Sequence, residues 1–193
     1  MSSHAGIRLI VGLGNPGAEY ESTRHNAGAW FVEALCSLNS IALKTDNKLF
    51  SRVGKLPGTT DCRLMIPSTY MNESGKSVLA VAQYFKIQPH EILVAHDELD
   101  FPVGNIKIKQ GGGHWGHNGL RDIIRCLGNK DFYRLRIGIN HPGHKDRVTG
   151  HVLNKPSAAD RTQIDDAISQ AVSIVPLLCE GKYQRATNQL HSD

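Results

Sequence analysis

A histidine between two polar residues, His25, follows a glycine-rich turn near the beginning of the sequence. The turn spans residues 12–17 (Gly-Leu-Gly-Asn-Pro-Gly) and ends a short apolar run, residues 9–11, typical of a buried strand. Small residues there would let the backbone approach a ligand closely. Neutral imidazole titrates near physiological pH, so His25 is a candidate general base that needs no metal ion. A strand, a glycine turn and an exposed histidine together favour the active site of an α/β enzyme.

Three further polar motifs stand where strands end or helices begin. They span residues 70–75 (Tyr-Met-Asn-Glu-Ser-Gly), 96–100 (His-Asp-Glu-Leu-Asp) and 111–119 (Gly-Gly-Gly-His-Trp-Gly-His-Asn-Gly). Loops at strand ends gather binding and catalytic groups in α/β sheets, so we expect these motifs to meet around His25.

Other kinds of site match these residues less well. The glycines of residues 12–17 fit the dinucleotide fingerprint G-x-G-x-x-G, but residues 18–23 delay the helix that should open on the turn. His96, His114 and His117 could bind a metal with neighbouring aspartates, yet they lack the H-E-x-x-H spacing and any supporting cysteine. No G-x-S-x-G elbow for a serine nucleophile is present. The sequence therefore predicts neither a metal nor a cofactor.

Hydrophobic periodicity predicts strands that alternate with helices, which is typical of an α/β fold. Strands are predicted at residues 9–11, 62–66, 92–95, 106–109 and 135–139. Helices are predicted at residues 26–39, 76–85, 120–127 with Gly128 as the C-cap, and in a C-terminal region 157–191. We expect residues 1–6 to be flexible and residues 141–149 to form a mobile polar loop.

The composition is that of a globular protein whose 193 residues suit a single domain. No apolar run reaches membrane-spanning length, and no signal-peptide pattern opens the sequence. Four widely spaced cysteines favour reduced thiols and a cytoplasmic protein. Residues 102–150 carry nine basic and three acidic side chains, a net +6, whereas the whole chain carries +4. This charge predicts a polyanionic partner such as nucleic acid; a solvated basic face without a partner is the alternative.

In order and spacing, the four motifs resemble those of bacterial-type peptidyl-tRNA hydrolases across almost the whole chain. The strand at 135–139 and the C-terminal helix are similar to that family as well. The resemblance implies a single-domain twisted mixed β-sheet flanked by helices on both faces. It also implies a monomeric, metal-independent carboxylic ester hydrolase of the cytoplasm, with no membrane partner. The substrate would be peptidyl-tRNA, cleaved between the peptide, or an N-blocked aminoacyl group, and the 3′ ribose, so that tRNA is recycled.

The resemblance also implies roles for individual residues. His25 corresponds to the catalytic base and Asp97 to its supporting carboxylate, while Asn15 would favour an N-blocked aminoacyl group over a free amine. Lys109 and Arg136 correspond to basic residues that clamp the terminal phosphate of the tRNA. The other substrate- and tRNA-binding positions are Tyr20, Tyr70, Met71, Asn72, His117 and Asn118.

Two positions depart from the family pattern. Tyr70 stands where phenylalanine is frequent, and Trp115 stands where glycine is common. The indole of Trp115 either narrows the cleft or adds a stacking surface. A second function also fits the sequence, a non-catalytic RNA-binding module that keeps the fold and the basic face. The joint presence of the histidine, the aspartate and the three asparagines of the motifs favours the enzyme.

Overall fold

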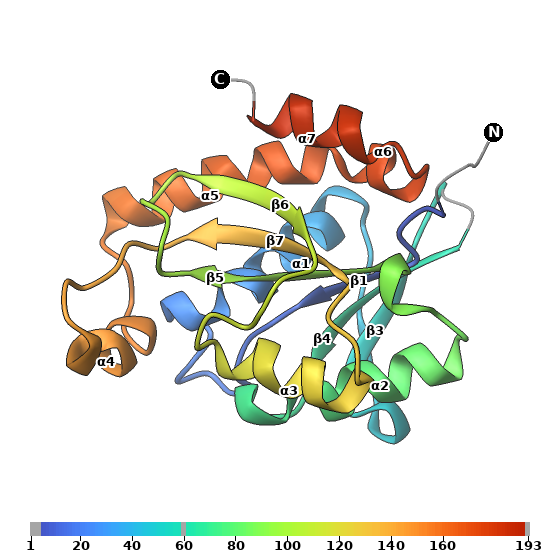
Figure 1. Cartoon of the computed structure of the whole chain (residues 1–193), viewed down its shortest axis with the longest axis horizontal. Coiled ribbons are helices and arrows are strands. Elements are labelled where there is room, and N and C mark those ends of the chain that lie inside the picture. Colours follow the sequence, from blue (N-terminus) through green and yellow to red (C-terminus); the bar gives the residue numbers. More distant parts are fainter. Residues whose placement is uncertain (1–4, 59–60, 192–193) are drawn as a thin grey trace.

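The computed structural model describes residues 5–58 and 61–191, and these contain seven strands that form one mixed sheet (Figure 1). The strands are β1 (Leu9–Gly12), β2 (Lys44–Asp46), β3 (Ser51–Leu56), β4 (Cys62–Pro67), β5 (Ile92–Glu98), β6 (Ile106–Gln110) and β7 (Tyr133–Gly138). Their order in the sheet is β2-β3-β4-β1-β5-β7-β6. The four strands β4, β1, β5 and β7 run parallel, whereas β2–β3, β3–β4 and β6–β7 pair antiparallel.

Helices cover both faces of this sheet. The first face packs against α1 (Ala27–Leu38), α5 (Ala158–Ser173), α6 (Val175–Cys179) and α7 (Tyr183–His191), the second against α2 (Ser74–Tyr84) and α3 (Asn118–Leu127) (Figure 1). Successive side chains of a strand point to opposite faces, so Ile10 of β1 joins the first core while Leu9 and Val11 join the second. The predicted mixed sheet with helices on both faces is confirmed.

The strand β5 is longer than the sequence predicts. The prediction ends at Ala95, but pairing with β7 continues through Glu98, and all seven residues of the strand are buried. The polar His96, Asp97 and Glu98 are tolerated because each has hydrogen-bond partners inside the protein. Residues 96–98 of this motif therefore belong to an interior strand of the sheet, and only Leu99 and Asp100 lie in the turn that follows.

The segment 141–149 is only partly a loop. Residues 145–147 form a 3₁₀ turn, and the helix α4 (Val148–Val152) follows, so the predicted polar loop is wrong over its second half. Val148 and Val152 stand four residues apart, a helical spacing that places both on one side. Both line the cavity of the candidate site, and this burial accounts for the helix.

The C-terminal region is helical as predicted, although it divides into three helices. Ser157 caps α5 by accepting a hydrogen bond from the backbone N–H of Asp160. Pro176 lies in the first turn of α6, and Gly181, with a φ of +75°, separates α6 from α7. The edge strand β2 and its neighbour β3 are absent from the sequence prediction. The residues of β2 are exposed or half-buried, and neither strand shows clear apolar alternation.

Close packing of α1 against the sheet fixes the position of His25. A Cβ atom on Gly28 would lie 2.1 Å from the carbonyl oxygen of Ala95, and one on Gly12 would lie 2.5 Å from the carbonyl oxygen of Gly28. Only glycine permits these approaches. Gly12 therefore makes room for a helix rather than for a ligand, which corrects the sequence interpretation. His25 lies in the 3₁₀ turn Arg24–Asn26, directly before α1.

Residues 1–4 of the predicted flexible segment 1–6 lie outside the described residues. The four cysteines carry free thiols. No helix within 5–58 and 61–191 is both long enough and apolar enough to cross a membrane.

Candidate active site

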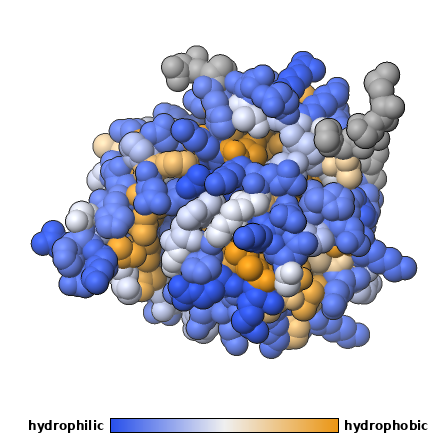
Figure 2. All heavy atoms as spheres, in the orientation of Figure 1, coloured by the Kyte–Doolittle hydropathy of each residue, from blue (hydrophilic) through white to orange (hydrophobic). Residues whose placement is uncertain are grey.

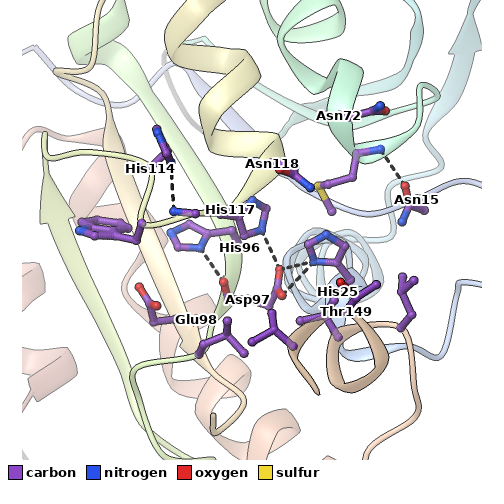
Figure 3. A pocket seen from close by; sticks show the side chains of 17 residues that line it. Asn15, His25, Asn72, His96, Asp97, Glu98, His114, His117, Asn118 and Thr149 are labelled. Carbon is purple, nitrogen blue, oxygen red and sulfur yellow. Dashed lines mark hydrogen bonds and ion pairs between the residues drawn. The ribbon is translucent and has the colours of Figure 1, made fainter. Parts of the chain in front are cut away.

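The motifs meet at the carboxyl ends of the parallel strands, around a cavity of about 350 Å³ (Figure 3). The loop after β1, the turn before α2, the end of β5 and the beginning of α3 each contribute to its lining. The predicted site residues that line it are Asn15, His25, Met71, Asn72, Asp97, His117 and Asn118. The predicted site residues outside its lining are Tyr20, Tyr70, Lys109 and Arg136.

His25 and Asp97 form a buried pair at the floor of this cavity. Atom Nδ1 of His25 lies 3.0 and 2.9 Å from the two carboxylate oxygens of Asp97. An ionised carboxylate only accepts hydrogen bonds, so Nδ1 carries the hydrogen and Nε2 is the basic nitrogen. The sequence interpretation had His25 exposed, but its exposed fraction is 9 %. The difference arises because α4 and the end of β5 enclose the same cavity.

The basicity of His25 follows from two opposing effects. Burial lowers the pKa of the imidazole, since a charged ring is poorly solvated there. The negative charge of Asp97 and its hydrogen bond outweigh burial, so the pKa of His25 is raised above the ordinary value of 6.5. An oriented imidazole with a raised pKa and a free Nε2 is the arrangement that general-base chemistry requires.

His117 is the second partner of Asp97. Its Nδ1 caps α3 by accepting hydrogen bonds from the backbone N–H groups of Gly119 at 3.1 Å and Leu120 at 3.3 Å. Atom Nε2 must therefore carry the hydrogen, and it donates to Oδ1 of Asp97 at 2.8 Å. The sequence predicts His117 as a substrate-binding residue. Both of its nitrogens are instead engaged by the protein, so only the ring face is left for a substrate.

This tautomer bears on the metal alternative. The ligand atoms of His25, Asp97 and His117 lie within 4.8 Å of one another, close enough to surround an ion. A metal on Nε2 of His117 would require a hydrogen on Nδ1, which already accepts two backbone hydrogen bonds. A metal on Nδ1 of His25 would displace the hydrogen that holds the ring against Asp97. These donors suit a hydrogen-bond network rather than metal coordination.

Two neighbouring residues of β5, Asp97 and His96, differ in charge, because the pKa of each is lowered. Burial raises the pKa of Asp97, but His25 and His117 dominate and hold it well below its usual range. His96 donates from Nδ1 to the carbonyl oxygen of Asp97 at 2.8 Å, and burial lowers the pKa of His96 to about 3, so its ring is neutral. Its Nε2 is buried and has no hydrogen-bond partner among the described residues.

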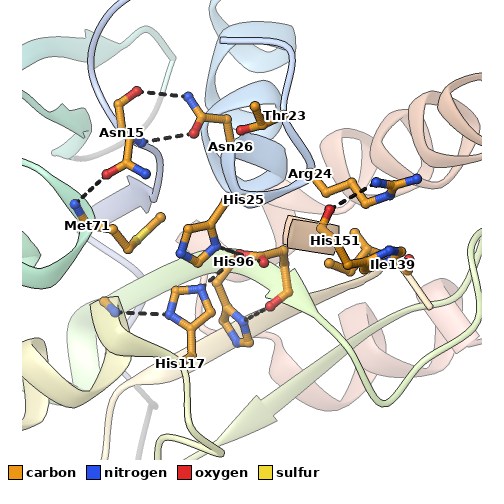
Figure 4. A network of polar contacts seen from close by, with 12 residues as sticks. Asn15, Thr23, Arg24, His25, Asn26, Met71, His96, His117, Ile139 and His151 are labelled. Carbon is orange, nitrogen blue, oxygen red and sulfur yellow. Dashed lines mark hydrogen bonds and ion pairs between the residues drawn. The ribbon is translucent and has the colours of Figure 1, made fainter. Parts of the chain in front are cut away.

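Asn15 is held by Asn26 and Met71 (Figure 4). The backbone N–H of Asn15 donates to Oδ1 of Asn26 at 2.9 Å, and Nδ2 of Asn26 donates back to the carbonyl oxygen of Asn15 at 3.0 Å. Side-chain Oδ1 of Asn15 accepts from the backbone N–H of Met71 at 2.7 Å. This leaves Nδ2 of Asn15 for a ligand. Asn26 is not among the predicted site residues, although its position directly after His25 in the sequence was a usable signal.

Tyr20 and Tyr70 lie beside one another outside the lining of the cavity. Tyr20 and Tyr70 meet edge to face with ring centroids 6.3 Å apart, and Tyr70 is 54 % exposed. The buried Met71 lines the cavity, whereas the two tyrosine rings do not. The opposite apolar side comes from α4, which is anchored where Nη1 of Arg24 donates to the carbonyl oxygen of His151 at 2.9 Å (Figure 4).

Not all of the positive side chains in the basic segment 102–150 lie on the surface. The side chain of Arg134 is buried and donates to the carbonyl oxygens of residues 112, 113 and 130. Burial and the charge of Arg136 lower the pKa of Arg134 to about 10. Atom Nε of Arg136 donates to Glu98 at 2.8 Å. Lys109 lies on the adjacent strand β6, with Nζ 5.4 Å from the centroid of the Trp115 ring.

Known proteins are similar to this chain in sequence and in fold. Residues 9–193 match the family model of peptidyl-tRNA hydrolase. Over 187 residues the chain is 55 % identical to a peptidyl-tRNA hydrolase of Coxiella burnetii, covering 97 % of this chain and 98 % of the relative. A relative from Legionella pneumophila is 52 % identical over 187 residues, covering 96 % and 99 %. The crystal structure of peptidyl-tRNA hydrolase from Acinetobacter baumannii has a TM-score of 0.94 and 51 % identity, covering 99 % of this chain and 98 % of that one. The chain therefore belongs to the peptidyl-tRNA hydrolase family of ester hydrolases.

Proposed function

We propose that this protein hydrolyses the ester between a peptide, or an N-blocked aminoacyl group, and the 3′ ribose of tRNA, with His25 as the general base. Atom Nε2 of His25 takes a proton from water, whose oxygen attacks the ester carbonyl carbon. Asp97 stabilises the imidazolium, which returns the proton to the departing ribose oxygen. The peptide leaves as an acid and the tRNA regains its hydroxyl. The proposal rests on the 2.9 Å hydrogen bond from Nδ1 of His25 to Asp97, because it leaves Nε2 as the base.

The asparagines suit the neutral polar groups of such a substrate. Because Met71 occupies Oδ1 of Asn15, Nδ2 is free to donate to the acyl carbonyl of an N-blocked aminoacyl group. A free α-ammonium group offers only donors and would meet this N–H unfavourably. Asn72 and Asn118, which line the same cavity, are assigned to hold the ester and to stabilise the oxyanion.

The RNA part of the substrate is assigned to the side of the cavity near β6 and β7. Lys109 and Arg136 offer an ammonium and a guanidinium to a terminal phosphate there. The exposed pair Tyr20 and Tyr70 is the candidate contact for the terminal adenosine, since aromatic edges and faces pack against bases. On this account the protein recycles tRNA in the cytoplasm and acts as a monomer.

Lys109→Ala is expected to weaken tRNA binding and to reduce the log–log salt slope by about 0.7 to 0.9, because one phosphate contact is lost. The measurement is the Kd of an uncharged acceptor-stem minihelix at several salt concentrations. Lys130→Ala is the matched control, an exposed lysine of the same basic segment that lies outside the motifs. Equal changes in both variants would mean a diffuse attractive field instead of a clamp.

Turnover of N-acetyl-aminoacyl-tRNA tests the proposed function as a whole. We expect each protein molecule to release many equivalents of N-acetyl amino acid, and to cleave the unblocked aminoacyl-tRNA far more slowly. Saturable binding of the substrate without release of the amino acid would favour the alternative, a non-catalytic RNA-binding module of the same fold.

A further inference from the structure

Trp115 occupies a backbone conformation that bulky residues rarely adopt. Its φ is +50°, in a loop where Gly111, Gly112 and Gly116 also have positive φ values. The left-handed region suits glycine, and a large side chain is retained there only where its contacts compensate. The indole is half-buried and lines the catalytic cavity, so its contacts identify what it does.

Those contacts are with the positive charges of β6 and β7. The centroid of the indole lies 4.2 Å from Cζ of Arg136, 5.2 Å from Cζ of Arg134 and 5.4 Å from Nζ of Lys109. Lys109 and Arg134 are register partners, and Arg136 follows two residues later on the same face of β7. All three distances are within cation–π range. The indole of Trp115 therefore lines the catalytic cavity and also contacts all three cations.

Arg136 is the cation that these contacts restrain most. Its Nε donates to Oε1 of Glu98 at 2.8 Å, and its guanidinium lies 4.4 Å from the ring of Phe101 in addition to the 4.2 Å contact with Trp115. Only 14 % of the side chain is exposed. Within the described part of the chain, its terminal nitrogens Nη1 and Nη2 donate no hydrogen bond, so they remain for an anion.

We propose that Trp115 is a positioning residue, which holds the guanidinium of Arg136 so that Nη1 and Nη2 present a fixed pair of donors to a phosphate of the bound tRNA. This inference rests on the proposed function, because it assumes the phosphate contact assigned to Arg136. A planar guanidinium binds phosphate through two parallel N–H donors only if its plane is oriented. Packing against the indole sets this orientation before the substrate arrives.

The test compares Trp115→Gly, which accepts the left-handed backbone without strain, with Trp115→Phe, which keeps an aromatic ring. We expect Trp115→Gly to weaken the Kd for an uncharged acceptor-stem minihelix by about 2- to 30-fold, the range of a cation–π contact. Trp115→Phe should recover most of this loss. With N-acetyl-aminoacyl-tRNA, KM should rise more than kcat falls. Thermal unfolding of each variant confirms that binding is measured on folded protein.

Repeating the Trp115→Gly substitution in an Arg136→Lys variant shows whether the change in Kd depends on the guanidinium of Arg136. Lysine keeps a positive charge opposite Glu98 but lacks the planar fork, so adding Trp115→Gly there should change the Kd by less than about 2-fold. Tighter binding by Trp115→Gly would mean that the indole obstructs the phosphate, and an equal loss in both backgrounds would mean that it acts without Arg136. Either result overturns the inference. Failure of the proposed hydrolysis would instead appear as absent turnover in the wild type, which the binding measurement does not require.

Discussion

Replacing His25 with alanine is expected to lower kcat on N-acetyl-aminoacyl-tRNA by about 10²- to 10⁴-fold, the usual effect of losing a positioned general base. The carboxylate of Asp97 would keep the N–H of His117 as a partner, so it is not left unpaired in the interior and the variant should fold. Binding of uncharged tRNA should change little, because His25 is assigned to the proton transfer. The measurement is the single-turnover rate together with the Kd.

His90→Ala is the matched control for this variant. It removes an imidazole from an exposed position outside the motifs, so the rate should stay at the wild-type value. A near-wild-type kcat for His25→Ala would rule out the mechanism, and an equal loss in both variants would point to a general effect of losing a histidine.

Asp97→Asn is expected to lower kcat by about 10²- to 10⁴-fold through a change of tautomer. An amide has one acceptor oxygen, whereas the carboxylate accepts N–H groups from both His25 and His117. His117 cannot change its tautomer without losing its cap bonds to Gly119 and Leu120, so the new NH₂ group faces His25. His25 would then carry its hydrogen on Nε2 and would no longer accept a proton from water.

The same variant should shift the pH dependence of the remaining activity. In the wild type, Asp97 raises the pKa of His25 in opposition to burial. Without the carboxylate the effect of burial remains, so the pKa falls below 6.5 and the acid limb of the rate profile moves to lower pH. Asp100→Asn makes the same chemical change at an exposed position three residues later and should leave the limb in place. An unmoved limb in Asp97→Asn would assign Asp97 a structural role only.

The features that the sequence predicts well are set by local pattern. The alternation in β7 and the helical spacing of α3 identify both elements, and Gly128 ends α3 with a φ of +64°, as a left-handed C-cap requires. His25 and Asp97 are separated by 72 residues, and their pairing is implied by the family resemblance, while the gathering of the motifs follows from strand ends that share one edge of a parallel sheet. In the structure the two side chains are joined by a hydrogen bond.

The features that the sequence cannot predict depend on contacts between distant segments. The role of His117 follows from its tautomer, which two backbone N–H groups of α3 and the carboxylate of Asp97 set together. The sequence suggests that Arg134 contributes to a charged surface, but its side chain is buried. The carbonyl oxygens of Gly112 and Gly113 accept its hydrogen bonds. Charge counts locate a basic segment without showing which of its side chains reach the solvent.

The pH dependence of the single-turnover rate, with enzyme in excess over N-acetyl-aminoacyl-tRNA, tests most directly the claim that neutral His25 takes the proton from water. A protonated ring cannot accept a proton, so the rate should fall as the pH drops through the pKa of His25. Because that pKa is raised, the account predicts a midpoint above 6.5 in the wild type and no such limb in the residual rate of His25→Ala. A wild-type rate that does not fall in acid, or the same limb in His25→Ala, would contradict the account.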